Sequence, residues 1–189
     1  MDFTRARFDE ENSGKDSKPR EHTNEITSVI DGSVVYGSDE TRAKALRSFR
    51  GGRLRILRPV GRGSLELPPL NTRRLENEGG SMRKDLFLVG DVRGNEQIVL
   101  TALHTLFLRE HNRLCALIAK KYQKARDEEI YQLARKIVGM EIQKITYDEW
   151  LPLLLGMCFP PLYITRVLSS HSSRRSLVTQ AKRIQRISV

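Results

Sequence analysis

Arg93 and Glu96 place a fixed cation and a carboxylate close together, just before a long apolar segment. An arginine keeps its charge at any usual pH, so Arg93 could bind an anion or stabilise negative charge. Glu96 would begin the following helix, where the helix dipole favours an anion. The alternative is an ion pair that caps a core helix, which is the commoner role of such residues.

A second set of residues offers oxygen atoms at alternate positions: Thr27, Val29, Asp31 and Ser33. Alternation along an extended chain places these side chains on one side. Calcium is a hard cation that takes roughly six to eight oxygens from carboxylates, hydroxyls and carbonyls. Three of these residues offer side-chain oxygens and Val29 offers a carbonyl, so the set could bind calcium. The residues alone favour the alternative, a polar edge strand in which Asp31 starts a turn.

Hydrophobic periodicity predicts the elements that must position these residues. A Gly90-Asp91 pair breaks the chain, and a helix is expected over 96–122, with Arg93 just before it. A second helix is expected over 127–145, and the two should pack together through their apolar stripes. The apolar positions are Val99, Leu103, Leu106, Phe107, Leu114 and Leu117 in the first helix, and Ile130, Leu133, Ala134, Ile137, Val138 and Ile145 in the second.

Less regular segments precede these helices. A short helix is expected over 39–49, begun near Ser38 and ended by a Gly-Gly pair. Residues 53–85 are rich in proline and glycine, which predicts loops with a short hairpin between 54–57 and 65–67. The expected fold class is mainly α, with long loops and little sheet.

Composition limits the classes of function. The chain of 189 residues has a formal net charge of +10, and its end, residues 157–189, contains basic residues but no acid. Such an end could bind an anionic lipid or nucleic acid, or be a disordered tail or sequence from an alternative exon. The arginines lack the interleaved aromatics of a single-strand nucleic-acid platform, and no zinc-finger spacing occurs. Two isolated cysteines, Cys115 and Cys158, do not establish a disulfide framework.

Three ordered stretches together resemble the animal-type haem peroxidases, the superfamily of peroxidasin, myeloperoxidase and cyclooxygenase. They are residues 27–38, residues 90–113 with Gly-Asp-Val-Arg-Gly-Asn-Glu at their start, and residues 134–156. Ordered matches at compatible spacing are much more specific than any single one. The resemblance implies a fragment of that helical fold, a partial domain over residues 23–156. Residues 1–22 would be a polar, disordered segment, and residues 157–189 a non-matching basic tail.

The resemblance implies roles for the residues above. Arg93 matches the distal arginine, which would orient hydrogen peroxide beside the haem iron and favour heterolytic splitting of the O–O bond. Glu96 matches the glutamate that many members join by an ester to a haem methyl group. The Thr27–Ser33 set matches the family's calcium loop, which normally gains a further aspartate from beside the distal histidine. Gln97 replaces the methionine that forms a sulfonium link in the myeloperoxidase branch, so that link is excluded.

The family also requires a distal histidine as acid and base and a proximal histidine as axial iron ligand. The four histidines of this chain are His22, His104, His111 and His171. His22 and His171 lie in polar contexts that do not match either role. His104 and His111 match structural helix positions, and their spacing of two turns suits one metal ion poorly, so we expect hydrogen-bonded core or interface residues. Neither iron-facing histidine is assigned.

The expected function is a haem-dependent peroxidase that reduces hydrogen peroxide and oxidises a small donor, in a truncated form with weak or no activity alone. Many relatives are secreted, but no signal peptide is visible and no segment is long enough to span a bilayer. The alternative is a non-enzymatic helical remnant that binds a partner or an anionic surface through its basic tail.

Overall fold

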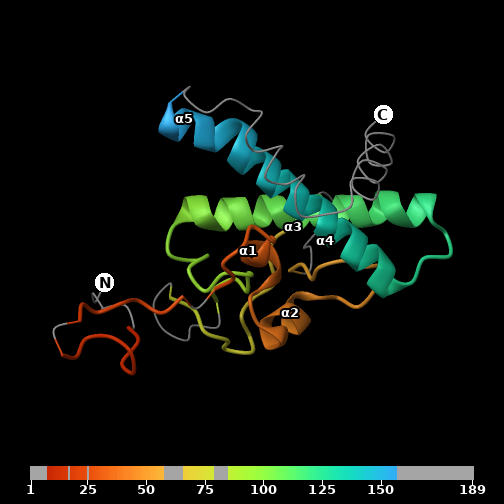
Figure 1. Cartoon of the computed structure of the whole chain (residues 1–189). Helices are drawn as coiled ribbons and strands as arrows, with labels where there is room; N and C mark the ends of the chain where they lie inside the picture. The colour runs from red at the N-terminus through yellow and green to blue at the C-terminus, as the bar shows by residue number, and fades with distance from the viewer. Residues whose placement is uncertain (1–7, 17, 25, 58–65, 79–84, 157–189) are drawn as a thin grey trace. The chain divides into compact units, whose positions relative to one another are not determined.

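The computed structural model describes residues 8–16, 18–24, 26–57, 66–78 and 85–156 (Figure 1). The chain divides into two compact units, residues 1–142 and 143–189. No β-strand forms among the described residues, which contain only isolated antiparallel bridges, so the mainly α prediction is confirmed. The elements in chain order are α1 (Ser33–Tyr36), α2 (Glu40–Leu46), α3 (Ile98–Lys121), α4 (Asp127–Lys144), the π-helix η1 (Ile145–Trp150) and α5 (Leu151–Leu155).

The start of α3 differs from the sequence prediction, because Gln97 is the N-cap and the helix begins at Ile98. The preceding residues close a turn of their own. The Gly94 N–H donates to the carbonyl of Asp91 at 3.1 Å, and the Glu96 N–H donates to the carbonyl of Arg93 at 2.9 Å. The predicted place of Glu96 on the first helical turn, and the dipole argument attached to it, are therefore wrong.

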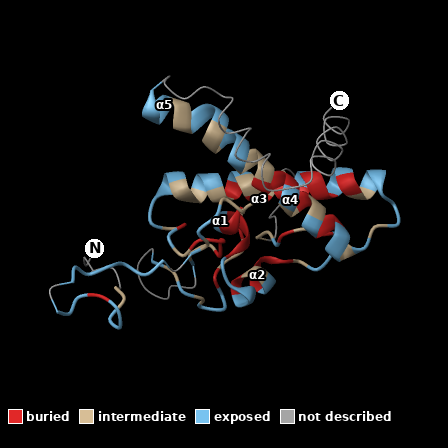
Figure 2. Cartoon of the chain, viewed as in Figure 1, coloured by how far each residue is buried: buried red, intermediate tan, exposed pale blue. Residues whose placement is uncertain are grey.

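The buried face of α3 also differs from the predicted apolar stripe. Val99, Leu103 and Leu106 are exposed, and the buried residues begin only at Thr105, after the first two turns of the helix (Figure 2). Polar side chains turn inward instead, because they bond to backbone groups of the loop 52–54: His111 bonds to Gly52 and Asn112 to Leu54. The buried residues of α3 are Thr105, Leu108, His111, Asn112, Leu114, Cys115 and Ile118.

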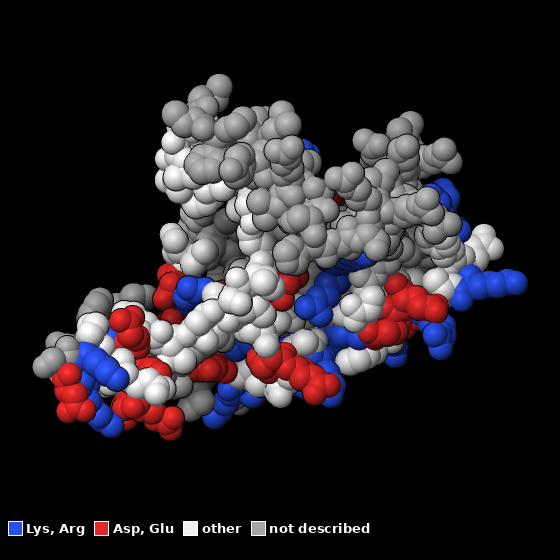
Figure 3. Space-filling model, viewed as in Figure 1, with Lys and Arg blue, Asp and Glu red and all other residues white. Residues whose placement is uncertain are grey.

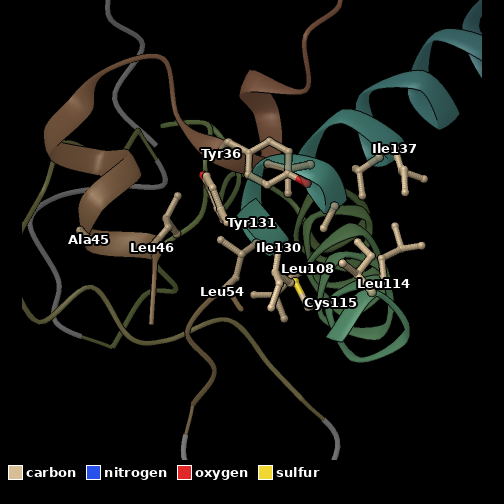
Figure 4. Close-up of a cluster of buried hydrophobic side chains, with 14 of the residues drawn as sticks. Tyr36, Ala45, Leu46, Leu54, Leu108, Leu114, Cys115, Ile130, Tyr131 and Ile137 are labelled. Carbon is tan, nitrogen blue, oxygen red and sulfur yellow. The ribbon is translucent and has the colours of Figure 1, made fainter. Parts of the chain in front are cut away.

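The second long helix largely agrees with its prediction, since α4 covers Asp127–Lys144 and buries Ile130, Ala134, Ile137 and Val138. Ile145, which was also predicted to be buried, is 43% exposed and begins η1. Three acidic residues lie in its first turn, where their negative charges interact favourably with the positive end of the helix dipole. The buried apolar residues of α3 and α4 belong to one hydrophobic cluster, together with Tyr36, Ala45, Leu46 and Leu54 (Figure 4). The two helices thus share a core, but α3 contributes Leu108, Leu114, Cys115 and Ile118 to it and not the predicted stripe.

The predicted helix over 39–49 is shorter in the structure. Asp39 is the N-cap and accepts a hydrogen bond from the Arg42 N–H at 2.8 Å. The helix ends at Leu46 because Arg47 turns to an extended conformation and pairs with Leu54. Its buried guanidinium binds Asp127 at 2.8 Å and Glu128 at 2.5 Å, which fixes this segment to the start of α4.

The less regular segments carry isolated bridges and single hydrogen bonds. Phe8 forms a bridge with His22, and the Asp9 N–H donates to the carbonyl of Glu21 at 2.9 Å. Residues 58–65 of the predicted hairpin lie outside the described residues, and one bond, from the Leu57 N–H to the Leu67 carbonyl at 2.8 Å, links its flanks. None of the described helices is long and apolar enough to cross a membrane.

The second unit contains η1 and α5, and within it Lys144, the last residue of α4, forms an ion pair with Asp148 of η1 at 2.5 Å. The basic tail of residues 157–189 lies outside the described residues. On the face drawn in Figure 3, acidic and basic side chains of the described residues are interspersed.

Candidate active site

The predicted cation, Arg93, is held by a carboxylate two positions earlier in the chain. Asp91 accepts three hydrogen bonds from Arg93: from its backbone N–H at 2.9 Å, from Nε at 2.9 Å and from Nη2 at 2.7 Å. The Asp91 side chain is only 8% exposed, whereas that of Arg93 is 47% exposed. The guanidinium is therefore fixed along one edge and open to solvent elsewhere.

Both members of this pair stay charged. The hydrogen bonds from Arg93 lower the pKa of Asp91 below its ordinary value, although burial acts in the opposite direction. The same bonds raise the pKa of Arg93. A buried carboxylate is costly without a partner, so the ion pair is what makes the buried position of Asp91 tenable.

The turn that carries Asp91 and Arg93 packs tightly against other elements of the first unit. A Cβ atom on Gly90 would overlap the backbone of Val34 in α1, and one on Gly94 would overlap the side chain of Val89 and the ring of His104. Arg42 of α2 donates from Nη1 to the carbonyl of Val89 at 3.0 Å. The turn is thus fixed on several sides before α3 begins.

His104 of α3 completes the surroundings of this turn. Burial lowers the pKa of its imidazole, and the nearby Asp91 carboxylate and a hydrogen bond with the Val34 backbone raise it in part. Sequence reasoning missed the roles of Asp91 and His104. The available signal was the carboxylate two residues before the arginine, a spacing that suits a side chain bonding to the backbone N–H two positions on.

Glu96 lies on the same turn as Arg93 and is exposed. It is near enough to contribute to the raised pKa of the arginine, although no hydrogen bond joins the two side chains among the described residues. The next residues, Ile98 and Val99, are 84% and 58% exposed. The turn therefore presents a cation, a carboxylate and apolar side chains in one short stretch of chain.

The residues of this turn suit one part of a haem site. A charged donor, a carboxylate and exposed apolar side chains fit contact with the edge of a haem. No described histidine is assigned as an axial ligand for its iron. His111 is fully buried with both ring nitrogens bonded, His104 is bound to the Val34 backbone, and His171 lies outside the described residues.

His111 and His104 are hydrogen-bonded residues of the folded unit, as expected. Nδ1 of His111 lies 2.8 Å from the Tyr36 hydroxyl, and Nε2 lies 2.8 Å from the carbonyl oxygen of Gly52. Burial lowers the pKa of this histidine to about 4. The ring is therefore neutral at neutral pH and acts in packing.

The predicted calcium residues lie together. Thr27 Oγ1 lies at hydrogen-bond distance from three oxygens: 3.0 Å from Asp31 Oδ1, 2.6 Å from Ser33 Oγ and 3.5 Å from the carbonyl oxygen of Val29. The extended alternation expected from the sequence is wrong. Tight turns bring the oxygens together instead, since the Asp31 N–H bonds to the Val29 carbonyl and Gly32 has a positive φ of 78°.

The donor chemistry of this oxygen cluster (Thr27, Val29, Asp31 and Ser33) suits a hard cation. Burial raises the pKa of Asp31, but hydrogen bonds from Ser33 and Thr27 outweigh it and leave the pKa below its ordinary value. The carboxylate is thus charged at neutral pH. No group of three or more His, Cys, Asp or Glu residues that could hold a metal occurs in the described part of the chain, so hydroxyl and carbonyl oxygens would have to supply most of the ligands.

Comparison with known proteins agrees with these features. The human peroxidasin homolog is 45% identical over 145 residues, which are 73% of this chain and 10% of that protein. Peroxinectin A of Dictyostelium discoideum is 41% identical over 146 residues, covering 75% of this chain and 27% of that protein. Mouse myeloperoxidase is 38% identical over 159 residues, covering 82% and 22%. The chain thus spans about a quarter or less of these relatives.

Solved structures show the same relationship. Peroxidase A from Dictyostelium discoideum superposes with a TM-score of 0.65 at 40% identity, covering 73% of this chain and 27% of that one. The fatty acid alpha-dioxygenase of Oryza sativa gives a TM-score of 0.53 at 32% identity, covering 74% and 20%. The family model for the animal haem peroxidase matches residues 1–175. Because that match covers most of its length, this chain belongs to the animal haem peroxidase family.

Proposed function

We propose that this chain supplies the peroxide-binding cation and one haem-facing edge of a peroxidase, an oxidoreductase that reduces hydrogen peroxide and oxidises a small donor. One observation carries the proposal: the Arg93 guanidinium is fixed by a buried carboxylate on one edge and open on the other, on the same exposed turn as Glu96. Haem, when bound, supplies the redox-active iron.

Arg93 would act on the peroxide itself. Its open N–H groups would donate hydrogen bonds to the bound oxygens and stabilise the negative charge that develops as the O–O bond breaks. A fixed donor does this better than a mobile one, because no reorganisation is needed during the reaction. Glu96 would face the porphyrin edge, where it is the proposed site of an ester link to a haem methyl group.

The oxygen cluster of Thr27, Val29, Asp31 and Ser33 would bind calcium. Two observations support this role. Three side-chain oxygens converge, because Thr27 Oγ1 lies 3.0 Å from Asp31 Oδ1 and 2.6 Å from Ser33 Oγ, and the Asp31 carboxylate is charged. In the metal-bound form these oxygens would contact the cation, and the hydrogen bonds between them would be lost. Further ligands would come from water or from another segment of the protein.

The isolated chain would have weak or no activity. No iron-facing histidine is assigned, and the chain spans only 10–27% of the relatives named above. The reaction of the whole relatives is therefore a proposal for this chain, together with hydrogen peroxide and the small reducing substrate as partners. Extracellular location, which is common among relatives, is equally a proposal.

The test is a titration of the purified chain with hemin, followed by the Soret band, and a measurement of peroxide turnover in the loaded protein. Arg93→Ala should lower residual turnover by roughly a hundredfold, the effect of losing one preorganised donor to a developing charge. Arg73→Ala is the matched control, because Arg73 is an exposed arginine outside this turn. In a loaded parent chain that turns over peroxide faster than free hemin, equal turnover in Arg93→Ala would reject the role of the guanidinium.

A further inference from the structure

The contacts of Arg93 single out a second residue of the proposed site. We propose that Asp91 is a positioning residue: it orients the Arg93 guanidinium so that the remaining donors face the ligand. This inference rests on the proposed function of Arg93 and extends it to the carboxylate that no catalytic step would touch.

The hydrogen bonds of the pair define the orientation. Asp91 uses Oδ1 to accept from both the backbone N–H and Nε of Arg93, and Oδ2 to accept from Nη2. A two-pronged contact of this kind fixes the plane of the guanidinium as well as its distance. The bond to the backbone N–H ties the same carboxylate to the turn, so the side chain and the main chain are fixed together.

The donors that stay free follow from this count. Nε and one hydrogen of Nη2 are engaged by Asp91, which leaves the two hydrogens of Nη1 and the outer hydrogen of Nη2. Within the described part of the chain, Asp91 is the hydrogen-bonding partner of this guanidinium. The free donors lie on the edge away from Asp91, and the 47% exposure of the side chain keeps them accessible.

Other nearby carboxylates cannot give this orientation. Glu78 and Glu96 contribute to the electrostatic environment of Arg93, but they are exposed and make no hydrogen bond to it among the described residues. Asp91 differs because it is buried and lies in a turn fixed by the close approach of Gly90 to Val34. An immobile acceptor is what a positioning role requires.

The test measures hydrogen exchange of the Arg93 Nε–H by NMR in the full chain, without haem. In the parent protein this proton should exchange on the order of tenfold more slowly than the Nε–H of the exposed Arg73, the protection that a charge-assisted hydrogen bond provides. In Asp91→Asn the remaining oxygen can still accept from the backbone N–H, but the side chain is neutral and its NH₂ group faces Nη2 donor to donor. This repulsion should turn the guanidinium away from the new amide and break the Nε–H bond as well, so most of the protection should be lost. Glu78→Gln, the matched control, should leave it unchanged.

Two results would overturn the proposal. One is equal exchange of Arg93 and Arg73 in the parent chain, a comparison that needs no variant to fold. The other is unchanged Arg93 protection in Asp91→Asn when backbone amide spectra show that α3 and α4 are intact.

A separate arm distinguishes this failure from failure of the proposed function. In hemin-loaded protein, Asp91→Asn should lower the rate of reaction with peroxide, and Arg93→Ala should lower it at least as much. If Arg93→Ala has no effect, the role of Arg93 falls, whatever the exchange data show. If Arg93→Ala lowers the rate and Asp91→Asn does not, the positioning role alone fails.

Discussion

At the scale of single residues, the core depends on one polar ring. His111 is fully buried, and its neutral imidazole carries one proton. The Gly52 carbonyl can only accept, so Nε2 must carry that proton, and Nδ1 must accept from the Tyr36 hydroxyl. Tyr131 contacts the ring edge-on at a centroid distance of 5.4 Å. Each polar atom of the ring therefore has a partner of defined role.

Tyr36→Phe is expected to destabilise the chain by about 1–3 kcal/mol, because it leaves Nδ1 of His111 buried without a donor. The free energy of unfolding measured by urea titration checks this. Tyr122→Phe is the control, since Tyr122 is 40% exposed and its hydroxyl has access to water. Equal effects of the two substitutions would contradict the assigned hydrogen bond.

The oxygen cluster gives a second residue-scale prediction. Calcium should raise the melting temperature of the parent chain, with about 2.7 kcal/mol of stabilisation at roughly a hundredfold excess over the dissociation constant. Ser33→Ala removes one oxygen of the cluster and should weaken this response. Ser28→Ala, in the same loop but outside the cluster, should retain it. If calcium leaves the melting temperature of the parent chain unchanged, the proposed site is wrong.

What the sequence predicted at this scale was residue type and neighbourhood. Arg93 and Glu96 do share a turn, and Thr27, Asp31 and Ser33 do meet, because each set is local in the chain. The missing part was orientation. The direction of the Arg93 guanidinium depends on a turn fixed by α1, which lies far away in sequence, so no local pattern could give it.

At the scale of elements, long regular segments were predicted well and their buried faces less well. The apolar spacing of α4 led to nearly correct bounds. The inward face of α3 was misjudged because polar groups of His111 and Asn112 are satisfied by the loop 52–54, contacts that hydrophobic periodicity does not register. Whether the predicted boundaries at residues 22 and 156 mark domains stays a prediction.

The loop that receives these bonds contains a matched pair of glycines. Gly51 and Gly52 have φ values of 60° and 71°, so alanine is strained by about 1–2 kcal/mol at either position. A Cβ atom on Gly51 would have no described atom within 4 Å, whereas one on Gly52 would lie 2.6 Å from the Tyr131 backbone nitrogen. An alanine would thus be strained to a similar extent at both positions, but only at Gly52 would its methyl group overlap a neighbouring element.

Gly52→Ala is expected to destabilise the chain by at least about 2 kcal/mol more than Gly51→Ala, because the added methyl group must push the loop away from α4. That movement would also displace the carbonyl that accepts from His111. Thermal and urea unfolding of both variants provide the comparison. Similar losses for the two alanines would mean that the loop does not pack on α4 as described.

At the scale of the whole molecule, the buried His111 and the half-buried Glu141 give stability opposite dependences on pH. Burial lowers the pKa of His111 from 6.5 to about 4, so its contribution is present above pH 6.5 and is lost as the pH falls toward 4. Burial and the nearby Glu110 raise the pKa of Glu141 from 4.5 to about 7, against the effect of Arg113. Its contribution is present below pH 4.5 and is lost as the pH rises through 7.

The groups around Glu141 come from both long helices. Glu110 of α3 accepts from Arg113 at 2.8 Å and 2.6 Å, so that arginine is already engaged and only partly compensates a second carboxylate. Protonated Glu141 can share a hydrogen bond with Glu110, whereas ionised Glu141 brings two like charges together. Ionisation at this point therefore opposes the packing of α4 on α3.

Glu141→Gln should remove this opposition, because glutamine keeps a donor for Glu110 and never ionises. Relative to the parent chain, the variant should gain about 1 kcal/mol of stability between pH 4.5 and pH 8, a figure reduced for solvent screening of a half-buried group. Urea unfolding across this pH range measures the gain. Glu10→Gln makes the same change in net charge at an exposed position and should give a flat difference. If both variants respond alike, net charge rather than the carboxyl pair governs the pH dependence, and the assigned contact between Glu110 and Glu141 is wrong.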